Sequence, residues 1–301
     1  MKVAGFTFIK NALIYDYPIR EAINSILPIC DEFIVAVGKS DDDTLNLIKQ
    51  INTNKIRVIE TEWDETQREG GRVLAIETDK AFSNISDDID WAFYIQGDEV
   101  VHEKYLNVIY EAMKQYKDIE QIDGLLFKYL HFYGSYDYIG TASNWYKHEI
   151  RVIKNNKSIF SYRDAQGFRK GENEKLRVVP IEACIYHYGW VKELIAMQRK
   201  QENFHKYWHD DNWVRKNVPL VEEFDYNRDI KELGRFSGQH PKVMQKRIND
   251  KNWGFNYDIS IDRKSLKDKI KDILSKYFGV NLEYKNYKIV RLRNTTKNKC
   301  H

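Results

Sequence analysis

The sequence predicts an α/β fold in which a mostly parallel central sheet carries helices on both faces. In the first 130 residues, short apolar runs alternate with longer segments whose apolar residues recur every three or four positions. Polar turns separate the two kinds of segment, and strands joined by helices of this length are typical of parallel βαβ units. The chain has 301 residues, of which 42% are hydrophobic, so it is long enough and apolar enough for a substantial core.

Each element of this half has its own signal. The run at 3–9 is apolar throughout, as expected of a buried strand. In the segment 19–27 the apolar residues fall on one helical face, and Pro28 ends that helix. Thr44 follows a polar turn and is expected to cap the next helix. The expected strands are 3–9, 33–37, 56–59 and 91–95, and the expected helices are 19–27, 44–51, 69–82 and 103–116.

The pattern changes after residue 120. Two strand-like runs at 125–132 and 149–153 have no long helix between them, which predicts a mixed rather than a parallel sheet. A helix is expected at 191–209, and the segment 234–241 is expected to be a loop. We expect one catalytic domain followed by an extension that is partly helical and basic, with bounds at 1–215 and 216–301.

The charge is unevenly distributed along the chain. From Arg263 to the end there are twelve Lys and Arg and three acids, which leaves a tail of +9 and a body of −6. Such a tail favours an anionic partner, either a membrane face or nucleic acid. Apolar residues at 264–278 fall on one helical face surrounded by lysines. That helix either docks on its own domain or lies at a membrane interface.

Cysteine usage and hydropathy indicate the compartment. Cys30, Cys184 and Cys300 have no metal-like spacing, and an odd, sparse set fits a reducing compartment. The N-terminus is interrupted by charge too early for a signal peptide, and no run of about 20 apolar residues could span a bilayer. We expect a cytoplasmic protein, with peripheral contact to a membrane as an open alternative. The sequence gives no indication of its oligomeric state.

Three polar segments follow three of the expected strands. They are 8–11, 38–43 and 96–99, and the carboxyl ends of parallel strands are where such sheets bind ligands. In the last of them, Asp98 could hold a divalent cation that bridges two phosphates, since hard oxygen ligands suit Mg²⁺ and Mn²⁺. The alternative is an ordinary turn in which Asp98 or Glu99 caps the following helix.

The order and spacing of these segments carry a resemblance to a known family. The first 130 residues resemble the nucleotide-binding half of family 2 glycosyltransferases with the GT-A fold, which is a Rossmann-like fold, and the likeness extends over roughly 3–200. Where the family commonly has Asp-x-Asp, this chain has Gln96-Gly97-Asp98, and it has Val37 and Gly38 where acids are frequent. The matching segments are 6–11, 21–28, 31–37, 38–44 and 93–100.

The resemblance implies a sugar transferase that uses a nucleotide-diphosphate donor and Mn²⁺ or Mg²⁺. It implies that Asp98 and His187 hold the metal, although a lone His between tyrosines is also a common packed residue. Arg72 would reach the ribose or diphosphate, or else form a surface salt bridge. Lys200 would offset the charge of the leaving diphosphate, or else lie on a solvated helix face. The remaining donor-binding residues implied are Phe8, Asn11, Gly38, Ser40, Asp41, Gln96 and Gly97.

Sugar transfer with inversion also needs a base for the acceptor hydroxyl. In the family this base is an acid between the metal motif and the late His, and Asp164 is the candidate here. Glu172 and Glu149 are alternatives, and a turn-capping role for Asp164 remains open. The side chains of Trp145, His148 and Trp190 are either walls of an acceptor site or core residues.

The sequence therefore predicts a glycosyltransferase that acts on a glycan or lipid-linked acceptor. One alternative is a glycan-binding or scaffolding protein with an inactive donor site, since Gln96 replaces an acid. Another is a nucleic-acid-binding protein that uses the basic tail. The acidic body and the lack of a binding motif argue against a nucleic-acid partner. A nucleotidyltransferase is less expected, because the first loop lacks a glycine-rich, basic signature.

Overall fold

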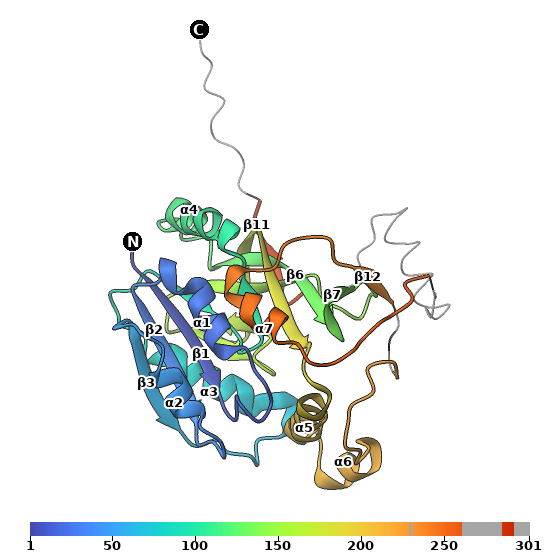
Figure 1. Ribbon diagram of the computed structural model, residues 1–301. Helices are drawn as coiled ribbons and strands as arrows, with labels where there is room; N and C mark the ends of the chain where they lie inside the picture. Colours follow the sequence, from blue (N-terminus) through green and yellow to red (C-terminus); the bar gives the residue numbers. More distant parts are fainter. Residues whose placement is uncertain (229, 231, 261–284, 292–301) are drawn as a thin grey trace.

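The computed structural model describes residues 1–228, 230, 232–260 and 285–291. In this part of the chain the strands form one mixed sheet with the order β3-β2-β1-β4-β8-β6-β11-β10-β9, and further strands branch from it. Figure 1 shows the parallel strands near the N-terminus on one side and the long strands β6 and β11 on the other. The expected α/β class, with helices on both faces, is confirmed.

The N-terminal half contains the expected alternation of strands and helices. The strands β3, β2, β1 and β4 are all parallel, and β4 lies beside β1. The helix of 103–116 begins with a 3₁₀ turn, and Pro28 lies in a 3₁₀ turn that follows α1. The elements are β1 (Val3–Ile9), α1 (Ile19–Ile26), β2 (Glu32–Gly38), α2 (Thr44–Lys49), β3 (Ile56–Thr61), α3 (Arg72–Ser83), β4 (Trp91–Tyr94) and α4 (Leu106–Tyr116).

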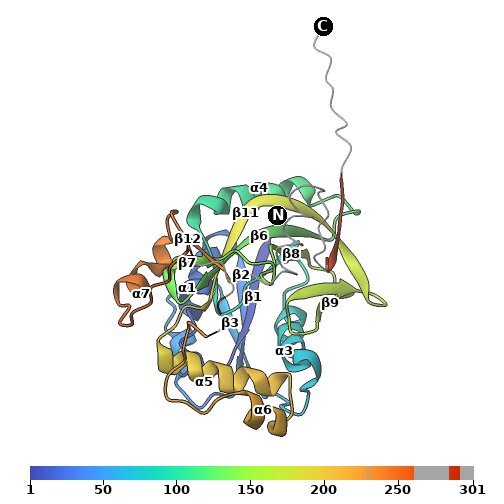
Figure 2. The same ribbon diagram turned by 90° about the vertical axis from the view of Figure 1, so that its right-hand side faces the viewer.

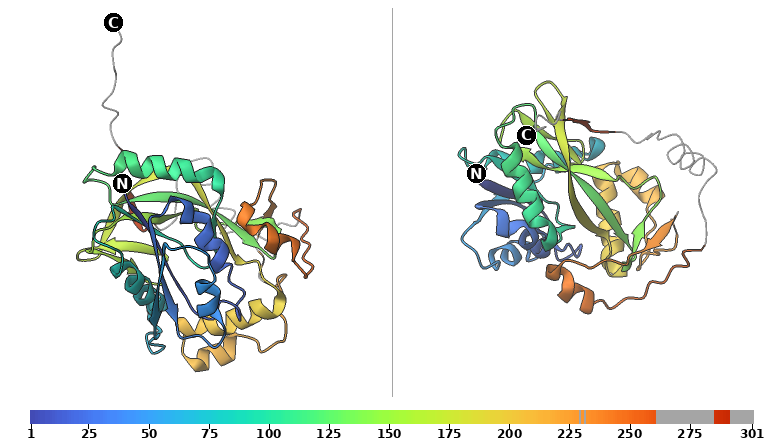
Figure 3. Two further views of the ribbon diagram at one scale, coloured as in Figure 1. Left: turned by 60° about the vertical axis from the view of Figure 1, so that its left-hand side comes forward. Right: turned by 90° about the horizontal axis from the view of Figure 1, so that it is seen from above.

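Side chains alternate across these strands and bury two separate cores. Val35 and Phe93 face the core beneath α1, α2 and α4, whereas Ile34 and Tyr94 face the core beneath α3. Figure 3 shows α1 and α3 on opposite faces of the parallel strands. Strands buried on both faces need nearly continuous apolar sequence, which is why these runs were recognisable.

The expected cap at Thr44 is wrong in detail. The N-cap residue of α2 is Asp43, and Thr44 is the first residue of the helix. The Thr44 hydroxyl instead accepts a hydrogen bond of 2.7 Å from the amide of Ala12 and donates one to Asp42. Thr44 therefore joins the loop after β1 to the loop after β2.

The second half of the sheet is mixed, as expected. Strand β8 pairs antiparallel with both β4 and β6, while β11 runs parallel to β6. Strand β11 crosses most of the molecule and bends where its register shifts between Pro180 and Cys184. The elements are β5 (Glu99–Val101), β6 (Gly124–Tyr133), β7 (Ser135–Gly140), β8 (His148–Lys154), β9 (Ile159–Tyr162), β10 (Gly167–Lys170) and β11 (Glu174–Trp190).

The helix expected at 191–209 is shorter. Helix α5 spans Leu194–Phe204, and the Glu193 side chain caps it by accepting a hydrogen bond from the amide of Ala196. A 3₁₀ turn and α6 (Asp211–Asn217) follow. Figure 2 shows α5 and α6 lying across the ends of the parallel strands.

The described part of the C-terminal extension packs against the preceding part of the chain, residues 1–215. Strand β12 (Leu233–Arg235), at the start of the expected loop, pairs with β7. Helix α7 (Gln245–Asn249) brings Arg247 to Asp16 and Glu21, and β13 (Tyr287–Ile289) pairs with β11. The boundary at 215/216 stays a prediction, and the amphipathic segment 264–278 lies outside the described residues. Within the described ranges, no helix is both long and apolar enough to cross a membrane.

Candidate active site

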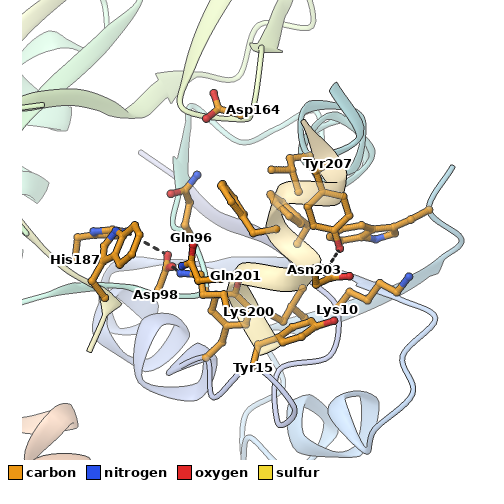
Figure 4. Close-up of a pocket in the computed structure, with 18 of the residues that line it drawn as sticks. Lys10, Tyr15, Gln96, Asp98, Asp164, His187, Lys200, Gln201, Asn203 and Tyr207 are labelled. Carbon is orange, nitrogen blue, oxygen red and sulfur yellow. Dashed lines mark hydrogen bonds and ion pairs between the residues drawn. The ribbon is translucent and has the colours of Figure 1, made fainter. Parts of the chain in front are cut away.

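A pocket of about 240 Å³, open to solvent, lies at the carboxyl edge of the parallel strands. Its floor comes from the segments after β1 and β4, and α5 forms one wall. Figure 4 shows Asp98, His187 and Lys200 gathered on one side, with Lys10, Asn203 and Tyr207 on another. The lining residues are Phe8, Ile9, Lys10, Tyr15, Tyr17, Trp63, Leu74, Gln96, Gly97, Asp98, Tyr146, Asp164, His187, Trp190, Lys200, Gln201, Asn203, Phe204 and Tyr207.

Hydrogen bonds join the loops after β1 and β2 beside this pocket. The Asn11 side chain donates to Asp41 at 3.1 Å and accepts from the amide of Asp41 at 2.7 Å. The Asn11 amide donates to the Ser40 hydroxyl at 3.0 Å, and that hydroxyl donates to the Gly38 carbonyl. None of these four residues lines the pocket. They fix the loop that follows Phe8 and carries Lys10.

Asp98 is buried at the end of the pocket. Its Oδ2 accepts a hydrogen bond of 3.1 Å from Lys200 Nζ, and its Oδ1 lies 3.7 Å from His187 Nε2. Burial alone would raise the pKa of Asp98, but the charges of Lys200 and Lys192 outweigh it and hold that pKa well below its usual range. Asp98 is therefore an anion at neutral pH.

The pairing of β11 with two neighbouring strands places His187 beside the Asp98 carboxylate. His187 on β11 is in register with Glu99 on β5 and with His131 on β6. Burial lowers the pKa of His187 to about 4, so its imidazole is neutral at pH 7. His187 Nδ1 lies 3.0 Å from His131 Nδ1, and His131 Nε2 lies 2.8 Å from the Tyr146 carbonyl oxygen.

Gly189 lets His187 and Asp98 approach each other. A Cβ atom at this position would lie 2.6 Å from His187 Nε2 and 2.8 Å from Asp98 Oδ2. Only a glycine fits between the two functional groups without moving them. The residue lies in the register shift between His187 and Trp190, which turns the end of β11 toward the pocket.

Glu99, the other acid of the motif, is engaged inside the core. It is fully buried and receives two hydrogen bonds from Arg151, at 2.8 and 2.7 Å, and one from the Tyr129 hydroxyl at 2.8 Å. A third donor is the amide of Gln96, at 3.1 Å. Glu99 thus holds the turn that carries Asp98 and has no carboxylate oxygen left for a ligand in the pocket.

Two lysines make the charged end of the pocket cationic. Lys200 Nζ also donates to the Gly189 carbonyl at 2.8 Å, and it lies 5.2 Å from the Tyr17 ring centroid. Lys192 is fully buried, with its ammonium donating to the Asp16 carbonyl at 2.7 Å. Burial and the nearby Lys200 lower the pKa of Lys192 to about 7.

The opposite end of the pocket is aromatic. Trp63 lies between Phe8 and Tyr207, with ring centroids 5.7 and 5.6 Å away. Lys10 Nζ lies 5.6 Å from the Trp63 ring centroid and pairs with Glu65 at 2.6 Å. This end therefore offers flat apolar surfaces beside a cation, which suits a planar ring.

Asp164 lines the pocket but lies apart from Asp98 and His187 (Figure 4). It occupies the turn between β9 and β10, where Arg163 and Ala165 have positive φ values of 56° and 62°. Burial raises the pKa of Asp164. The Gln96 side chain donates to the Ala165 carbonyl at 3.2 Å and so ties this turn to the Asp98 motif.

The other candidate residues occupy varied places. Glu172 is exposed in the turn after β10, and Arg72 is exposed at the start of α3. Glu149 is buried behind the Asp164 turn, where Gln166 donates to its Oε1 at 2.9 Å. Burial raises its pKa to about 8. Of the suggested acceptor walls, Trp190 lines the pocket, while Trp145 and His148 do not.

Two buried residues beside the pocket carried no recognisable sequence signal. Lys192 and His131 are single polar residues beside strand ends, and nothing local distinguishes them from packed residues. The aromatic wall had a visible clue, because the segment 203–208 combines aromatic and amide side chains on one helical turn. Residues lining this wall are Asn203, Phe204 and Tyr207.

The donor groups of Asp98 and His187 fit a divalent cation. Metal–ligand bonds of about 2.1 Å to each atom are long enough to span the 3.7 Å between Asp98 Oδ1 and His187 Nε2. Gly189 keeps the space beside both groups free of a side chain. In the described ranges no cluster of three or more His, Cys, Asp or Glu could bind a metal. A cation here would need oxygen ligands from elsewhere, such as a substrate diphosphate.

Comparison with known proteins gives only remote likenesses. No family model and no curated protein matches the chain. TarS 1–349 of S. aureus in complex with UDP is 13% identical, with a TM-score of 0.39 over 74% of this chain and 68% of that one. A 4-diphosphocytidyl-2C-methyl-D-erythritolsynthase from Anaerococcus prevotii DSM 20548 is 12% identical, with a TM-score of 0.37 over 68% of this chain and 95% of that one.

A third structure is glucosyl-3-phosphoglycerate synthase from Mycobacterium tuberculosis with Mn²⁺, UDP and phosphoglyceric acid. It is 21% identical, with a TM-score of 0.28 over 43% of each chain. Two of these three structures contain UDP, and one of those two also contains Mn²⁺. All three TM-scores lie below 0.5, so the likenesses by themselves assign neither a family nor a function.

Proposed function

We propose that this protein is a glycosyltransferase that moves a sugar from a nucleotide-diphosphate donor to a hydroxyl of a glycan or lipid-linked acceptor. One observation carries the proposal: a single pocket joins an aromatic end to an end that holds a carboxylate, a neutral imidazole and the ammonium of Lys200. A nucleotide-diphosphate sugar has the matching parts, a planar base and a diphosphate. The pocket lies at the carboxyl edge of parallel strands, where such sheets bind ligands.

The two ends of the pocket give the donor one orientation. The base would stack against Phe8 and Trp63, and the diphosphate would lie near Lys200. The ammonium of Lys200 neutralises the charge that develops on the diphosphate as it leaves. Lys192 adds positive potential from behind, and this is strongest below its pKa of about 7.

Mn²⁺ or Mg²⁺ would be held by Asp98 Oδ1 and His187 Nε2. When bound, such a cation acts as a Lewis acid on the diphosphate oxygens. The protein's own contribution is to keep Asp98 ionised and His187 neutral, the states in which each has a lone pair for a metal. Glu99 and Arg151 hold the Asp98 turn in place.

Asp164 would act as the base in an inverting transfer. Its carboxylate would accept the proton of the acceptor hydroxyl while the hydroxyl oxygen forms a bond to the anomeric carbon and the bond to the diphosphate breaks. A carboxylate with a raised pKa is a stronger base than a solvated one. The acceptor would enter on the side of Trp190 and Asp164.

The test is a thermal-shift screen of nucleoside diphosphates with and without Mn²⁺. A ligand at a hundredfold excess over its Kd stabilises the fold by about 2.7 kcal/mol, which raises the melting temperature by about 4 °C for a chain of this size. Asp98→Asn should lose the Mn²⁺-dependent part of the shift. The matched control is Asp88→Asn, since Asp88 is an exposed partner of Lys2.

Turnover of the corresponding nucleotide sugar then separates an enzyme from an inactive binding protein. We expect metal-dependent release of the nucleoside diphosphate by the wild type and none by Asp98→Ala. The proposal fails if no nucleoside diphosphate shifts the melting temperature at millimolar concentration. It fails equally if Asp98→Ala transfers sugar at the wild-type rate.

A further inference from the structure

A chain of hydrogen bonds leads from the backbone to the imidazole that faces Asp98. It begins at the Tyr146 carbonyl oxygen, which lies 2.8 Å from His131 Nε2, and continues over 3.0 Å from His131 Nδ1 to His187 Nδ1. His131 is buried beside the Tyr129 and Trp145 rings, and such burial disfavours the charged form of an imidazole. In its neutral form each of the two imidazoles carries a single N–H.

The direction of these bonds follows from the carbonyl group. A carbonyl oxygen only accepts, so the N–H of His131 is on Nε2 and its Nδ1 has a lone pair. His187 Nδ1 must then donate to that lone pair, which places the only N–H of His187 on Nδ1. His187 Nε2 is left with a lone pair directed toward Asp98.

In this arrangement two hydrogen-bond acceptors, His187 Nε2 and Asp98 Oδ1, face each other. In this tautomer His187 Nε2 has no proton to offer to Asp98 Oδ1, 3.7 Å away, and the Asp98 carboxylate, which accepts a hydrogen bond from Lys200, has none to offer in return. Two such acceptors repel unless a cation or a donor lies between them. The protein therefore imposes on His187 the tautomer that binds a metal through Nε2 and excludes the one that would hydrogen-bond to Asp98.

The ring of His131 is also held in a fixed position and orientation. Its ring stacks between Tyr129 and Trp145, with centroid distances of 5.5 and 5.0 Å and interplanar angles of 25° and 29°. His131 and His187 are register partners on the parallel strands β6 and β11. The ring of His131 is thus held by strand pairing, by stacking and by the Tyr146 carbonyl.

We propose that His131 is a positioning residue that fixes the tautomer and orientation of His187 so that Nε2 binds the cation of the donor complex. The inference rests on the proposed function, in which Asp98 and His187 hold that cation. Partners that orient a metal-binding His through its other nitrogen typically affect metal affinity by about 10- to 100-fold. Trp145 contributes to this positioning because its ring packs against His131.

The first test needs neither metal nor activity. In ¹⁵N-labelled, metal-free protein, two-dimensional NMR of the imidazole nitrogens distinguishes a protonated Nδ1 from a protonated Nε2. We expect His187 to be protonated on Nδ1 and His131 on Nε2 at pH 7. Finding the proton of His187 on Nε2 in the wild type overturns the inference, whatever the protein's activity.

The second test measures the affinity of variants for Mn²⁺ with inorganic pyrophosphate, the part that all nucleotide-diphosphate donors share, by electron paramagnetic resonance. His131→Phe removes the acceptor for His187 Nδ1 and should weaken binding by about 10- to 100-fold. His131→Gln keeps a hydrogen-bond acceptor and a donor, and should therefore retain most of the wild-type affinity for Mn²⁺ with pyrophosphate. The matched control is His240→Phe, because His240 has the same kind of bond through Nε2 to a carbonyl, that of Tyr136, on another side of the sheet.

His187→Ala separates a failure of the inference from a failure of the proposed function. If His187→Ala abolishes Mn²⁺–pyrophosphate binding while His131→Phe binds as the wild type does, the metal site stands and the role of His131 is refuted. If His187→Ala binds normally, the metal assignment itself is wrong and the inference falls with it. Weaker binding in both variants, with recovery in His131→Gln, supports both.

Discussion

The substitution Gly189→Ala adds one methyl group at the charged end of the pocket. It tests whether activity depends on the relative placement of His187 and Asp98. The added Cβ would lie 2.6 Å from His187 Nε2 and 2.8 Å from Asp98 Oδ2. Since ordinary contacts of this kind begin near 3.4 Å, the imidazole must move by about 0.8 Å, and a shift near 1 Å in a reacting group costs about 10²-fold in rate. We therefore expect kcat/KM for the nucleotide sugar to fall about 10²-fold, which corresponds to about 2.7 kcal/mol of transition-state stabilisation.

The fold itself should tolerate this change. The atoms displaced are the ends of side chains, and the backbone of Gly189 does not have a positive φ. The matched control is Gly254→Ala, where a Cβ meets nothing within 4 Å and the glycine has no positive φ. Both variants should melt within a few degrees of the wild type, and only Gly189→Ala should lose turnover. Wild-type kcat/KM in Gly189→Ala would refute the claim that His187 and Asp98 work as a pair.

Three further predictions concern other carboxylates. Asp164→Asn should lower turnover about 10²- to 10⁴-fold while donor affinity stays unchanged; unaltered turnover with intact donor binding in a rapid-quench assay would remove Asp164 as the base. Glu99→Gln leaves Arg151 charged and incompletely paired in the core, so urea unfolding should show a loss of about 3–5 kcal/mol, and a loss below 1 kcal/mol would contradict the role assigned to this pair. Burial raises the pKa of Glu149 from 4.5 to about 8, so between these values the folded chain keeps a proton that the unfolded chain has released. Stability should then fall by about 1.4 kcal/mol per pH unit over that window, and Glu149→Gln should remove this slope; a stability difference between the two proteins that is constant from pH 5 to pH 8 would speak against it.

The parallel half of the fold could be predicted because its signals are local. Strands β1, β2 and β4 are buried on both faces, so runs such as 33–37 are apolar throughout, and Pro28 marks the end of a helix. That the carboxyl ends of three strands lie at the same edge of the sheet followed from their parallel pairing alone. The bounds of α5 were less predictable, since Val191 and Lys192 are buried in the bend between β11 and α5 although their sequence continues the helical pattern.

The mixed half and part of the site depend on contacts between distant residues. Strand β11 was not predicted as one element, because Pro180 within it normally argues against a central strand. His131 and His187 meet only through the register of β6 and β11, and no local pattern marks either as the other's partner. The structure does bring together Asp98, His187 and Lys200, which the resemblance had grouped, while Arg72 remains exposed outside the pocket.

The central claim is that a metal and a diphosphate meet at the end of this pocket. The most direct measurement is an anomalous difference map, recorded at the manganese edge, from crystals grown with Mn²⁺ and the best-stabilising nucleoside diphosphate. The account predicts one peak bonded to Asp98 Oδ1 and His187 Nε2, with diphosphate oxygens completing its coordination. A nucleotide bound in the pocket with no manganese at those two atoms, or manganese bound elsewhere on the chain, would contradict it.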